Sequence, residues 1–357
     1  MRIATLADAA AGHTQRWVEC FRGRGHEVRV WSLECGPEGL HAERLPTLPL
    51  PRFLRYPLAA PALSRALDRY RPDLVDAHFV PNYGLLGALC RWRPLAVTAW
   101  GSDLLLGGRR DPARRARARF VLRRADLVLA DAENLARAAR ELGAPAARVH
   151  HVPWGVDLAR FRPAGTHEAG LLVSTRMHES IYDLPTLLAG VAPVMARRPH
   201  TRLVIAGDGS LRGALERSAA RLLPAGRYRF VGLLEPPALA SWLARAEIYL
   251  STSRSDSTSI SLLEAMAAGA LPVVSDIEGN RQWVGEGEGG RLFAPGDPTS
   301  LAGAIERALD EPARMEAARA RNRHLVEERG DAARNMAFIE SLFATLSGRE
   351  GRPREAR

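Results

Sequence analysis

The sequence predicts an α/β protein with two parallel sheets, and two observations support this. Short apolar runs alternate with helix-length segments along most of the 357 residues, as strands joined by helical crossovers would. These runs fall into two series of about six, more than one sheet usually holds. A segment rich in Gly and Pro, over 152–170, separates the two series and predicts a linker.

The expected strands are short and rich in Val, Ile and Leu, as in sheets that are buried on both faces. In the first series they are 2–6, 27–33, 73–79, 95–100, 125–130 and 148–152. In the second series they are 171–175, 202–207, 228–232, 247–251 and 271–275. The helical segments among and after them include 14–24, 183–197, 211–223, 236–245, 300–309, 312–329 and 331–346. We therefore expect an N-terminal domain over 1–163, a C-terminal domain over 164–330, a last helix over 331–347 and a disordered charged tail over 348–357.

Composition is that of a soluble globular protein, with 46% hydrophobic and 25% charged residues. The net charge is +10, but all fifty cations are arginines in a chain rich in Ala, Gly and Pro, so coding bias explains much of the basicity. No nucleic-acid-binding signature appears, and no nucleic-acid partner is expected. The cysteines Cys20, Cys35 and Cys90 lack metal spacing, and neither a signal peptide nor a membrane-spanning run is present, which favours a cytoplasmic protein.

A single carboxylate, Glu264, stands among apolar residues shortly after the expected strand over 247–251. The loop between them falls at the carboxyl end of a parallel strand, where open α/β sheets bind ligands. Free amides over 259–262 would suit a phosphate. Glu264 could accept two vicinal ribose hydroxyls, and Asp256 could meet a second polyol. The alternative is that Glu264 only stabilises its own helix start, where negative charge is favoured.

Several segments, in the same order, resemble landmarks of the retaining glycosyltransferases of family 4, which have the GT-B fold. From Asp256 the sequence reads DSTSISLLEAMAAGALPVVSDIEGN, which is similar to the family's donor-site signature of an acidic residue, seven residues and then Glu. The segment over 152–163, VPWGVDLARFRP, resembles the family's interdomain segment, with Trp154 in place of Asn. The resemblance covers nearly the whole chain. It implies two Rossmann-like domains facing a central cleft, with the last helix returning to the first domain.

The resemblance also assigns residues of the second domain to the donor. Arg176 matches the family's Arg that neutralises the donor diphosphate, whereas the family's Lys five residues on falls on Ile181. His178 or Arg254 are the cations considered as substitutes for that Lys. The backbone near Leu233 would meet the edge of the base. Taken alone, Arg176 could equally be a solvated residue at a strand end.

The first domain carries weaker similarities. Gly12 and His13 lie at a strand-to-helix turn, where family members hold a glycine-containing loop against the donor phosphates. Trp100 occupies the position of a family His that approaches the transferred sugar. Asp103 is a candidate acceptor of a hydroxyl hydrogen, and His78 ends another strand on the same rim. For Gly12 and His78, a purely structural role is the alternative.

An arginine-rich segment over 107–124 includes the cluster from Arg109 to Arg119. In a chain with this arginine bias, the cluster is typical of the solvent-exposed face of a helix. The alternative is a patch that holds the protein peripherally on an anionic membrane, at the inner face of the cell membrane, near a lipid-linked acceptor.

Together these features predict a metal-independent enzyme that moves a sugar from a nucleoside-diphosphate sugar to a hydroxyl acceptor with retention, and that needs no cofactor. The expected donor-binding residues are Gly12, Arg176, Leu233, Asp256, Ser259, Ile260, Ser261 and Glu264. Of these, Arg176, Asp256 and Glu264 are expected to act in catalysis, while the acceptor-side residues are His13, His78, Trp100 and Asp103. Two alternatives remain, a nucleotide-sugar epimerase on the same fold and a non-catalytic member that binds a sugar nucleotide or glycan.

Overall fold

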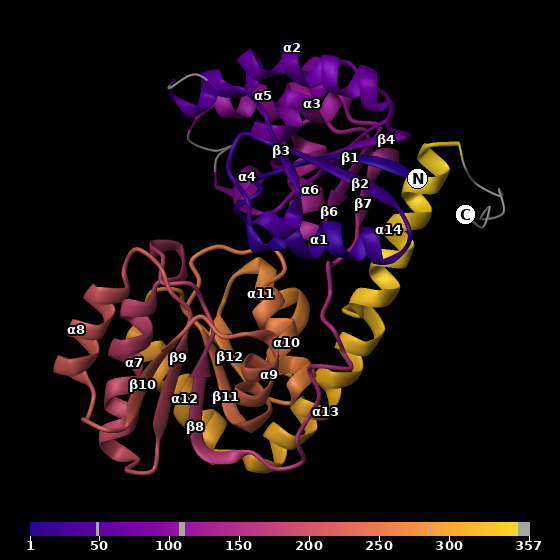
Figure 1. The fold of residues 1–357 in the computed structure, drawn as a ribbon. Coiled ribbons are helices and arrows are strands. Elements are labelled where there is room, and N and C mark those ends of the chain that lie inside the picture. The colour runs from indigo at the N-terminus through magenta and orange to yellow at the C-terminus, as the bar shows by residue number, and fades with distance from the viewer. Residues whose placement is uncertain (48–49, 107–110, 286, 349–357) are drawn as a thin grey trace. The chain divides into compact units, whose positions relative to one another are not determined.

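The computed structural model describes residues 1–47, 50–106, 111–285 and 287–348. Contacts divide the chain into two units. Unit 1 comprises Met1–Val152 and the segment from Met336 on, and unit 2 comprises Pro153–Asn335. Figure 1 shows each unit as a sheet with helices on its faces.

The sheet of unit 1 has seven parallel strands in the order β3-β2-β1-β4-β5-β6-β7. The strands are β1 (Arg2–Leu6), β2 (Glu27–Ser32), β3 (Ala42–Arg44), β4 (Leu74–His78), β5 (Leu95–Thr98), β6 (Leu127–Ala130) and β7 (Val149–His151). The helices are α1 (Gly12–Gly23), α2 (Arg52–Tyr70), α3 (Leu85–Cys90), α4 (Ser102–Leu105), α5 (Pro112–Arg124), α6 (Glu133–Glu141) and α14 (Ala332–Leu346), the last of which begins in unit 2. A π-helical segment over Phe79–Gly84 joins β4 to α3.

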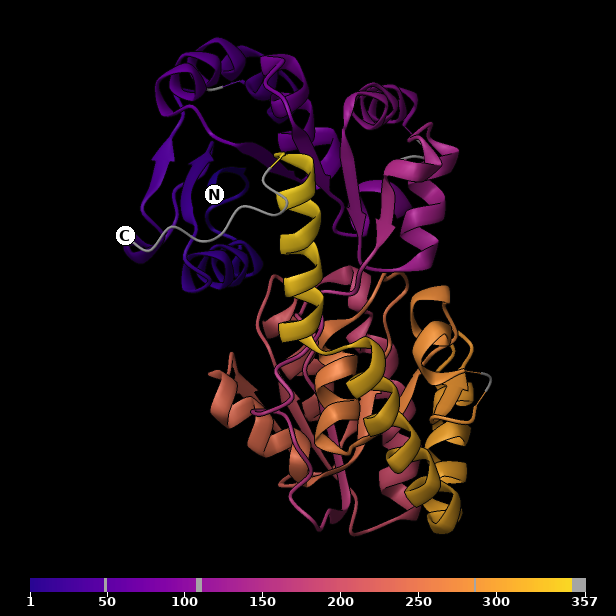
Figure 2. The same cartoon turned by 90° about the vertical axis from the view of Figure 1, so that its right-hand side faces the viewer.

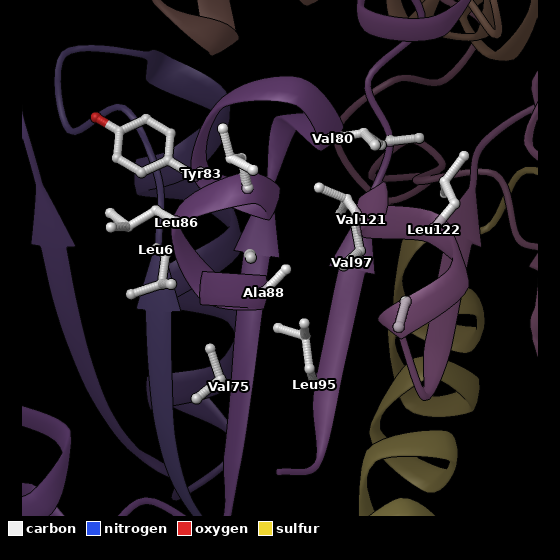
Figure 3. Packing of buried hydrophobic residues seen from close by; sticks show 14 of the residues in the cluster. Leu6, Val75, Val80, Tyr83, Leu86, Ala88, Leu95, Val97, Val121 and Leu122 are labelled. Carbon is white, nitrogen blue, oxygen red and sulfur yellow. The ribbon is translucent and has the colours of Figure 1, made fainter. Parts of the chain in front are cut away.

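The core of unit 1 lies between the sheet and its helices. Figure 3 shows Leu86 of α3 beside Leu6 of β1, and Val97 of β5 beside Val121 of α5. All four side chains are fully or almost fully buried. The apolar faces of the strands thus fix the helix layer, and with it the loops at the strand ends.

The sheet of unit 2 has six parallel strands in the order β10-β9-β8-β11-β12-β13. The strands are β8 (Glu168–Ser174), β9 (Arg202–Ala206), β10 (Tyr228–Gly232), β11 (Ala246–Ser251), β12 (Leu271–Ser275) and β13 (Arg291–Phe293). The helices are α7 (Leu184–Arg197), α8 (Arg212–Leu222), α9 (Pro236–Arg245), α10 (Ile260–Ala268), α11 (Glu278–Val284), α12 (Pro298–Asp310) and α13 (Pro312–Arg329). Helix α13 packs against α10, and both helices can be followed in Figure 2.

In both sheets the strand order reverses once. In unit 1 the reversal lies between β1 and β4, and in unit 2 it lies between β8 and β11. Loops that leave the carboxyl ends of such strand pairs diverge and leave room for a ligand. The structure therefore singles out the segments after β1 and β4 in unit 1, and after β8 and β11 in unit 2.

The last helix contributes to unit 1 from the far end of the sequence. Ile339 and Phe343 of α14 are fully buried. Phe343 stacks on Phe21 of α1 with ring centroids 5.4 Å apart, and Glu340 accepts from Arg24 at 3.0 Å. No helix in the described part of the chain is long and apolar enough to cross a bilayer.

Candidate functional site

Helix α10 of unit 2 starts beside the point where the strand order reverses. Its N-cap is Ser259, whose hydroxyl accepts from the amide of Leu262 at 3.3 Å. The expectation that this amide is free is therefore wrong, because the helix caps itself. The helix ends at Gly269, which has a φ of +89° that favours glycine. Ser259 and Ser261 lie in its first turn and point their hydroxyls at one cation.

That cation is Arg176, which follows β8 and is 7% exposed. Its guanidinium donates to the hydroxyls of Ser259 and Ser261, at 2.7 Å to the latter, and to the carboxylate of Asp256 at 2.6 Å. The ring of Tyr182 lies 4.2 Å from the guanidinium carbon. Burial opposes the charged form, but Asp256, Tyr249 and Tyr182 together outweigh burial and raise the pKa of Arg176. The structure thus brings together four of the residues predicted from the sequence.

Glu264 lies one turn further along α10 and is 8% exposed. Its neighbours Leu262, Leu263, Ala265 and Met266 are fully buried. Helix α10 is therefore enclosed by apolar packing, and a carboxylate in such a place costs free energy unless it is paired. Packing alone does not account for Glu264.

Neither His178, after β8, nor Arg254, after β11, is an obvious replacement for the family's Lys. The backbone carbonyl of Ile181 accepts from the amide of Arg254 at 2.8 Å. The guanidinium of Arg254 donates to Asp183 at 2.6 Å. His178 is fully buried, and burial, followed by the charge of Arg212, lowers its pKa. His178 is therefore neutral near pH 7, and Arg254 already has an acidic partner.

Two further donor candidates lie at the loop ends of unit 2. Leu233 follows β10 and is 68% exposed, which is unusual for a leucine and leaves its backbone at the surface. Ile260 is the first residue of α10 and is half-buried. Tyr249 was not among the predicted residues, but its hydroxyl lies 2.8 Å from that of Ser261.

In unit 1 a group of rings comes from α1, from the end of β4 and from the segment after β5. His13 lies 4.1 Å from Trp100, measured between ring centroids, and His78 lies 5.4 Å from Trp100. Trp17 completes the group, 5.1 Å from His78. Burial, with smaller contributions from His78 and Arg16, lowers the pKa of His13 to about 4. Thus the structure places His13, His78 and Trp100 together, with His13 neutral near pH 7.

The buried carboxylate of Asp76 binds two members of this group, Trp17 and His78. It is fully buried in β4 and accepts from Trp17 Nε1 at 2.8 Å, from Thr98 Oγ1 at 3.0 Å and from His78 Nε2 at 2.9 Å. Sequence reasoning missed Asp76, although an Asp in the middle of an apolar strand is a signal that could have found it.

Asp103 and Gly12 occupy different surroundings. Asp103 is 1% exposed, and its carboxylate accepts from the backbone amides of Val80, Trp100 and Leu104. Burial raises the pKa of Asp103, and these amides oppose the shift. The carboxylate therefore holds the loop that carries Trp100. Gly12 begins α1, and a Cβ built there would meet nothing within 4 Å, so the packing gives no reason for glycine at this position.

The cluster expected from Arg109 to Arg119 is only partly visible, because Arg109 and Arg110 lie outside the described residues. The remainder lies on α5, where Arg115 and Arg119 are exposed and Arg114 and Arg117 are half-buried. Within the described ranges, no group of three or more His, Cys, Asp or Glu side chains could hold a metal ion.

Two family models match the chain in succession. Residues 10–160 match the model described as Glycosyltransferase Family 4, and residues 168–311 match Glycosyl transferases group 1. The chain is 32% identical over 215 residues, 55% of its length, to D-inositol 3-phosphate glycosyltransferase 2 of Catenulispora acidiphila, covering 50% of that protein. It is 32% identical over 167 residues, 45% of its length, to phosphatidyl-myo-inositol mannosyltransferase of Mycolicibacterium smegmatis, covering 42% of that protein. The chain thus spans about half the length of the first curated relatives it matches.

Solved structures share the fold over almost the whole chain. Sucrose-phosphate synthase from Thermosynechococcus elongatus superposes with a TM-score of 0.82 at 20% identity, covering 98% of this chain and 99% of that one. The Anabaena protein Alr3699/HepE, solved with UDP and glucose, gives a TM-score of 0.81 at 17% identity, covering 97% of this chain and all (100%) of that one. The expected architecture of two Rossmann-like parallel sheets is confirmed.

Proposed function

Because the chain belongs to the family 4 glycosyltransferases, which have the GT-B fold, we propose that it transfers a sugar from a nucleoside-diphosphate sugar to a hydroxyl acceptor with retention at the anomeric carbon. The observation that carries the proposal is the group formed by Arg176, Ser259, Ser261 and Asp256 at the start of α10. A buried cation with hydroxyl and amide donors beside it is suited to a diphosphate.

In the proposed reaction the bond between the anomeric carbon and the donor phosphate breaks, and a bond to the acceptor oxygen forms on the same face. The departing phosphate oxygen takes the proton of the acceptor. Arg176 stabilises the negative charge that develops on the diphosphate, together with the amides of Ser259, Ile260 and Ser261. The charge that the reaction needs is thus supplied by this chain's own residues, and the proposal requires neither a metal ion nor a cofactor.

We propose the remaining donor contacts from where the other predicted residues lie in each unit. Glu264 would accept hydrogen bonds from the two ribose hydroxyls, and Leu233 would present its backbone to the base. Asp256 would accept from a hydroxyl of the transferred sugar once the diphosphate engages Arg176. On unit 1, Gly12 would approach the phosphates, and His13, His78 and Trp100 would face the reacting sugars, with Asp103 holding their loop.

A panel of sugar nucleotides tests the proposal, with protection against heat as the readout. A ligand at 100 times its Kd stabilises the native state by about 2.7 kcal/mol. We expect one base and one sugar to protect the wild type, and Glu264→Ala to lose that protection without losing its fold, since Ala favours helices. Glu216→Ala is the matched control, because Glu216 is exposed on α8. Equal protection of Glu264→Ala would refute the ribose role.

The two alternatives predict different products. A nucleotide-sugar epimerase would convert the protecting donor when no acceptor is present, and a non-catalytic member would leave it unchanged with any acceptor. We expect neither. The proposed transferase would release the nucleoside diphosphate only as the acceptor gains a glycosidic bond, and mass analysis of both products would measure this.

The acceptor is proposed to be lipid-linked, with unit 1 resting peripherally on an anionic membrane from the cytoplasmic side. Helix α3 packs against both α2 and α5. Exposed Leu54 and Leu58 lie on α2, and exposed Arg115 and Arg119 lie on α5. Helices α2 and α5 thus expose apolar and cationic side chains respectively, and an interfacial surface uses both kinds.

Co-sedimentation with anionic vesicles tests this surface. Each arginine near the membrane contributes about 1 kcal/mol, and salt screens the attraction. We expect Arg115→Gln/Arg119→Gln to weaken binding by roughly tenfold or more. Arg217→Gln/Arg221→Gln, an exposed pair with the same spacing on α8, should not weaken it. If both double variants pellet like the wild type, the acceptor must be sought among soluble molecules.

A further inference from the structure

A cavity of about 500 Å³ opens on unit 2 and shares no residue with the proposed donor site. Its lining comes from the residue after β12, from α11 and β13, from the end of α12 and from the start of α13. The lining residues are Asp276, Arg281, Gly287, Arg291, Leu292, Arg307, Glu311 and Arg314. A cavity of this volume is in the range of small-molecule sites.

The charges of this cavity do not balance among the described residues, since four arginines face two carboxylates. Asp276 accepts two bonds from Arg281, and Glu311 accepts from Arg291 at 2.6 Å and from Arg314 at 3.4 Å. Arg307 is exposed, and no ion pair joins it to another part of the described chain. Among the described residues that line it, the cavity therefore has an excess of positive charge.

One donor of a residue that lines the cavity has no acceptor among the described residues. The side chain of Arg291 is 13% exposed, and its Nε is buried without a hydrogen-bond partner in the described part of the chain. Buried donors nearly always have an acceptor, and arginine suits planar or tetrahedral oxyanions through paired N–H groups. An oxyanion in the cavity would meet Arg307 and Arg314, and Arg291 would join them by turning its guanidinium toward the cavity.

The short helix α11 connects this cavity to the loop that carries Asp256. On one side Arg281 binds Asp276 at the cavity wall. On the other side Gln282 Nε2 donates to Thr258 Oγ1 at 3.1 Å, and Trp283 Nε1 donates to the same oxygen at 3.3 Å. A Cβ on Gly279 would lie 2.1 Å from the carbonyl oxygen of Ser257, so helix and loop are in direct backbone contact.

We propose that the cavity is an effector site for the phosphate monoester of a small polyol, such as a sugar phosphate, and that it acts on the donor loop through α11. The phosphate joins Arg307 and Arg314, takes up the free donor of Arg291 as that side chain turns, and draws Arg281 away from Asp276. The polyol fills the rest of the volume against Leu292. A shift of α11 then moves Thr258 and, with it, the loop from Asp256 to Ser259. By linkage, a ligand of that loop changes the affinity of the effector by the same factor.

Calorimetric titration of the full chain with glucose 6-phosphate tests the binding, and inorganic phosphate is the second arm. We expect glucose 6-phosphate to bind more tightly than inorganic phosphate. Arg307→Gln/Arg314→Gln should weaken binding of the sugar phosphate by about tenfold or more, which is the effect of losing one charged hydrogen bond. Arg217→Gln/Arg221→Gln should leave it unchanged, and both variants should melt like the wild type because all four side chains are exposed.

Amide hydrogen exchange over residues 256–259 tests the coupling. We expect saturating glucose 6-phosphate to change exchange there in the wild type and not in Arg307→Gln/Arg314→Gln. Equal affinity of wild type and double variant, or no binding, would overturn the site. If inorganic phosphate bound as tightly as glucose 6-phosphate, the polyol part of the proposed ligand would be wrong. If amide exchange over residues 256–259 did not change, the effector role would be wrong. None of these readouts depends on glycosyl transfer.

Discussion

Arg176 and Asp256 illustrate how much one buried pair depends on both partners. Their side chains are 8% and 19% exposed, and they lie 2.6 Å apart. Asp256→Asn strands a buried guanidinium, and Arg176→Gln removes the partner of the carboxylate. Each change should lower the free energy of unfolding by about 2 to 4 kcal/mol. The double variant should lose less than the sum by at least about 1 kcal/mol, measured by urea denaturation.

The surface pair of Arg197 and Glu306 provides the matched cycle, because its side chains are 57% and 28% exposed. Its coupling should stay below about 1 kcal/mol. Additive losses for Arg176 and Asp256, or a coupling as small as that of the surface pair, would mean that the buried contact contributes nothing specific.

Single residues also mark the limit of what the sequence could predict. Arg176, Asp256, Ser259 and Ser261 could be assigned to one site because all follow strands that end at the same edge of a sheet. Asp76 could not be linked to Trp17 and Thr98 in advance, although it accepts from both. Periodicity places residues in strands, but it does not tell which side chains from distant strands meet.

Elements were predictable where their pattern was long. The helices at the end of the chain, α12, α13 and α14, lie where the periodicity placed them. The edge strands β3 (AER) and β13 (RLF) each contain a charged residue and lack the Val- and Ile-rich run of the other strands, and they were not predicted. Helix α2 was not predicted either. It contains Pro57 and Pro61, each without a backbone N–H, and it persists because Tyr56, Leu63 and Leu67 are buried in the core of unit 1.

Helix α11 was also outside the prediction, and its shortness explains why. It spans seven residues and includes Gly279, which a propensity argument would read as a turn. The structure supplies another reason for glycine there, since the carbonyl oxygens of Asp256 and Ser257 lie where a Cβ would be. Close backbone approach is a tertiary requirement, and a sequence expresses it only as a glycine among others.

At the scale of the whole molecule, the sequence located a Gly- and Pro-rich linker and put the domain boundary after residue 163. The contacts of the chain divide it after Val152. Between these points, Val156 and Phe161 are buried in the core of unit 2, and Arg323 donates to the carbonyl of Phe161 at 2.8 Å. Turn-forming residues show where a chain changes direction, but packing decides which unit a linker joins.

The helix α14 offers a test of the two units as separate cooperative bodies. Phe343 is fully buried against Phe21, whereas Phe338 on the same helix is 48% exposed. Phe343→Ala should cost unit 1 about 3 to 5 kcal/mol through lost burial and the cavity left behind. Phe338→Ala should change the free energy of unfolding by no more than about 0.5 kcal/mol.

In scanning calorimetry we expect two transitions. Phe343→Ala should lower the temperature of only one of them, because α14 packs into unit 1 and the core of unit 2 is unchanged. A single transition that shifts as a whole would show that the units unfold together, and equal shifts for the two variants would show that the buried face of α14 does not hold unit 1.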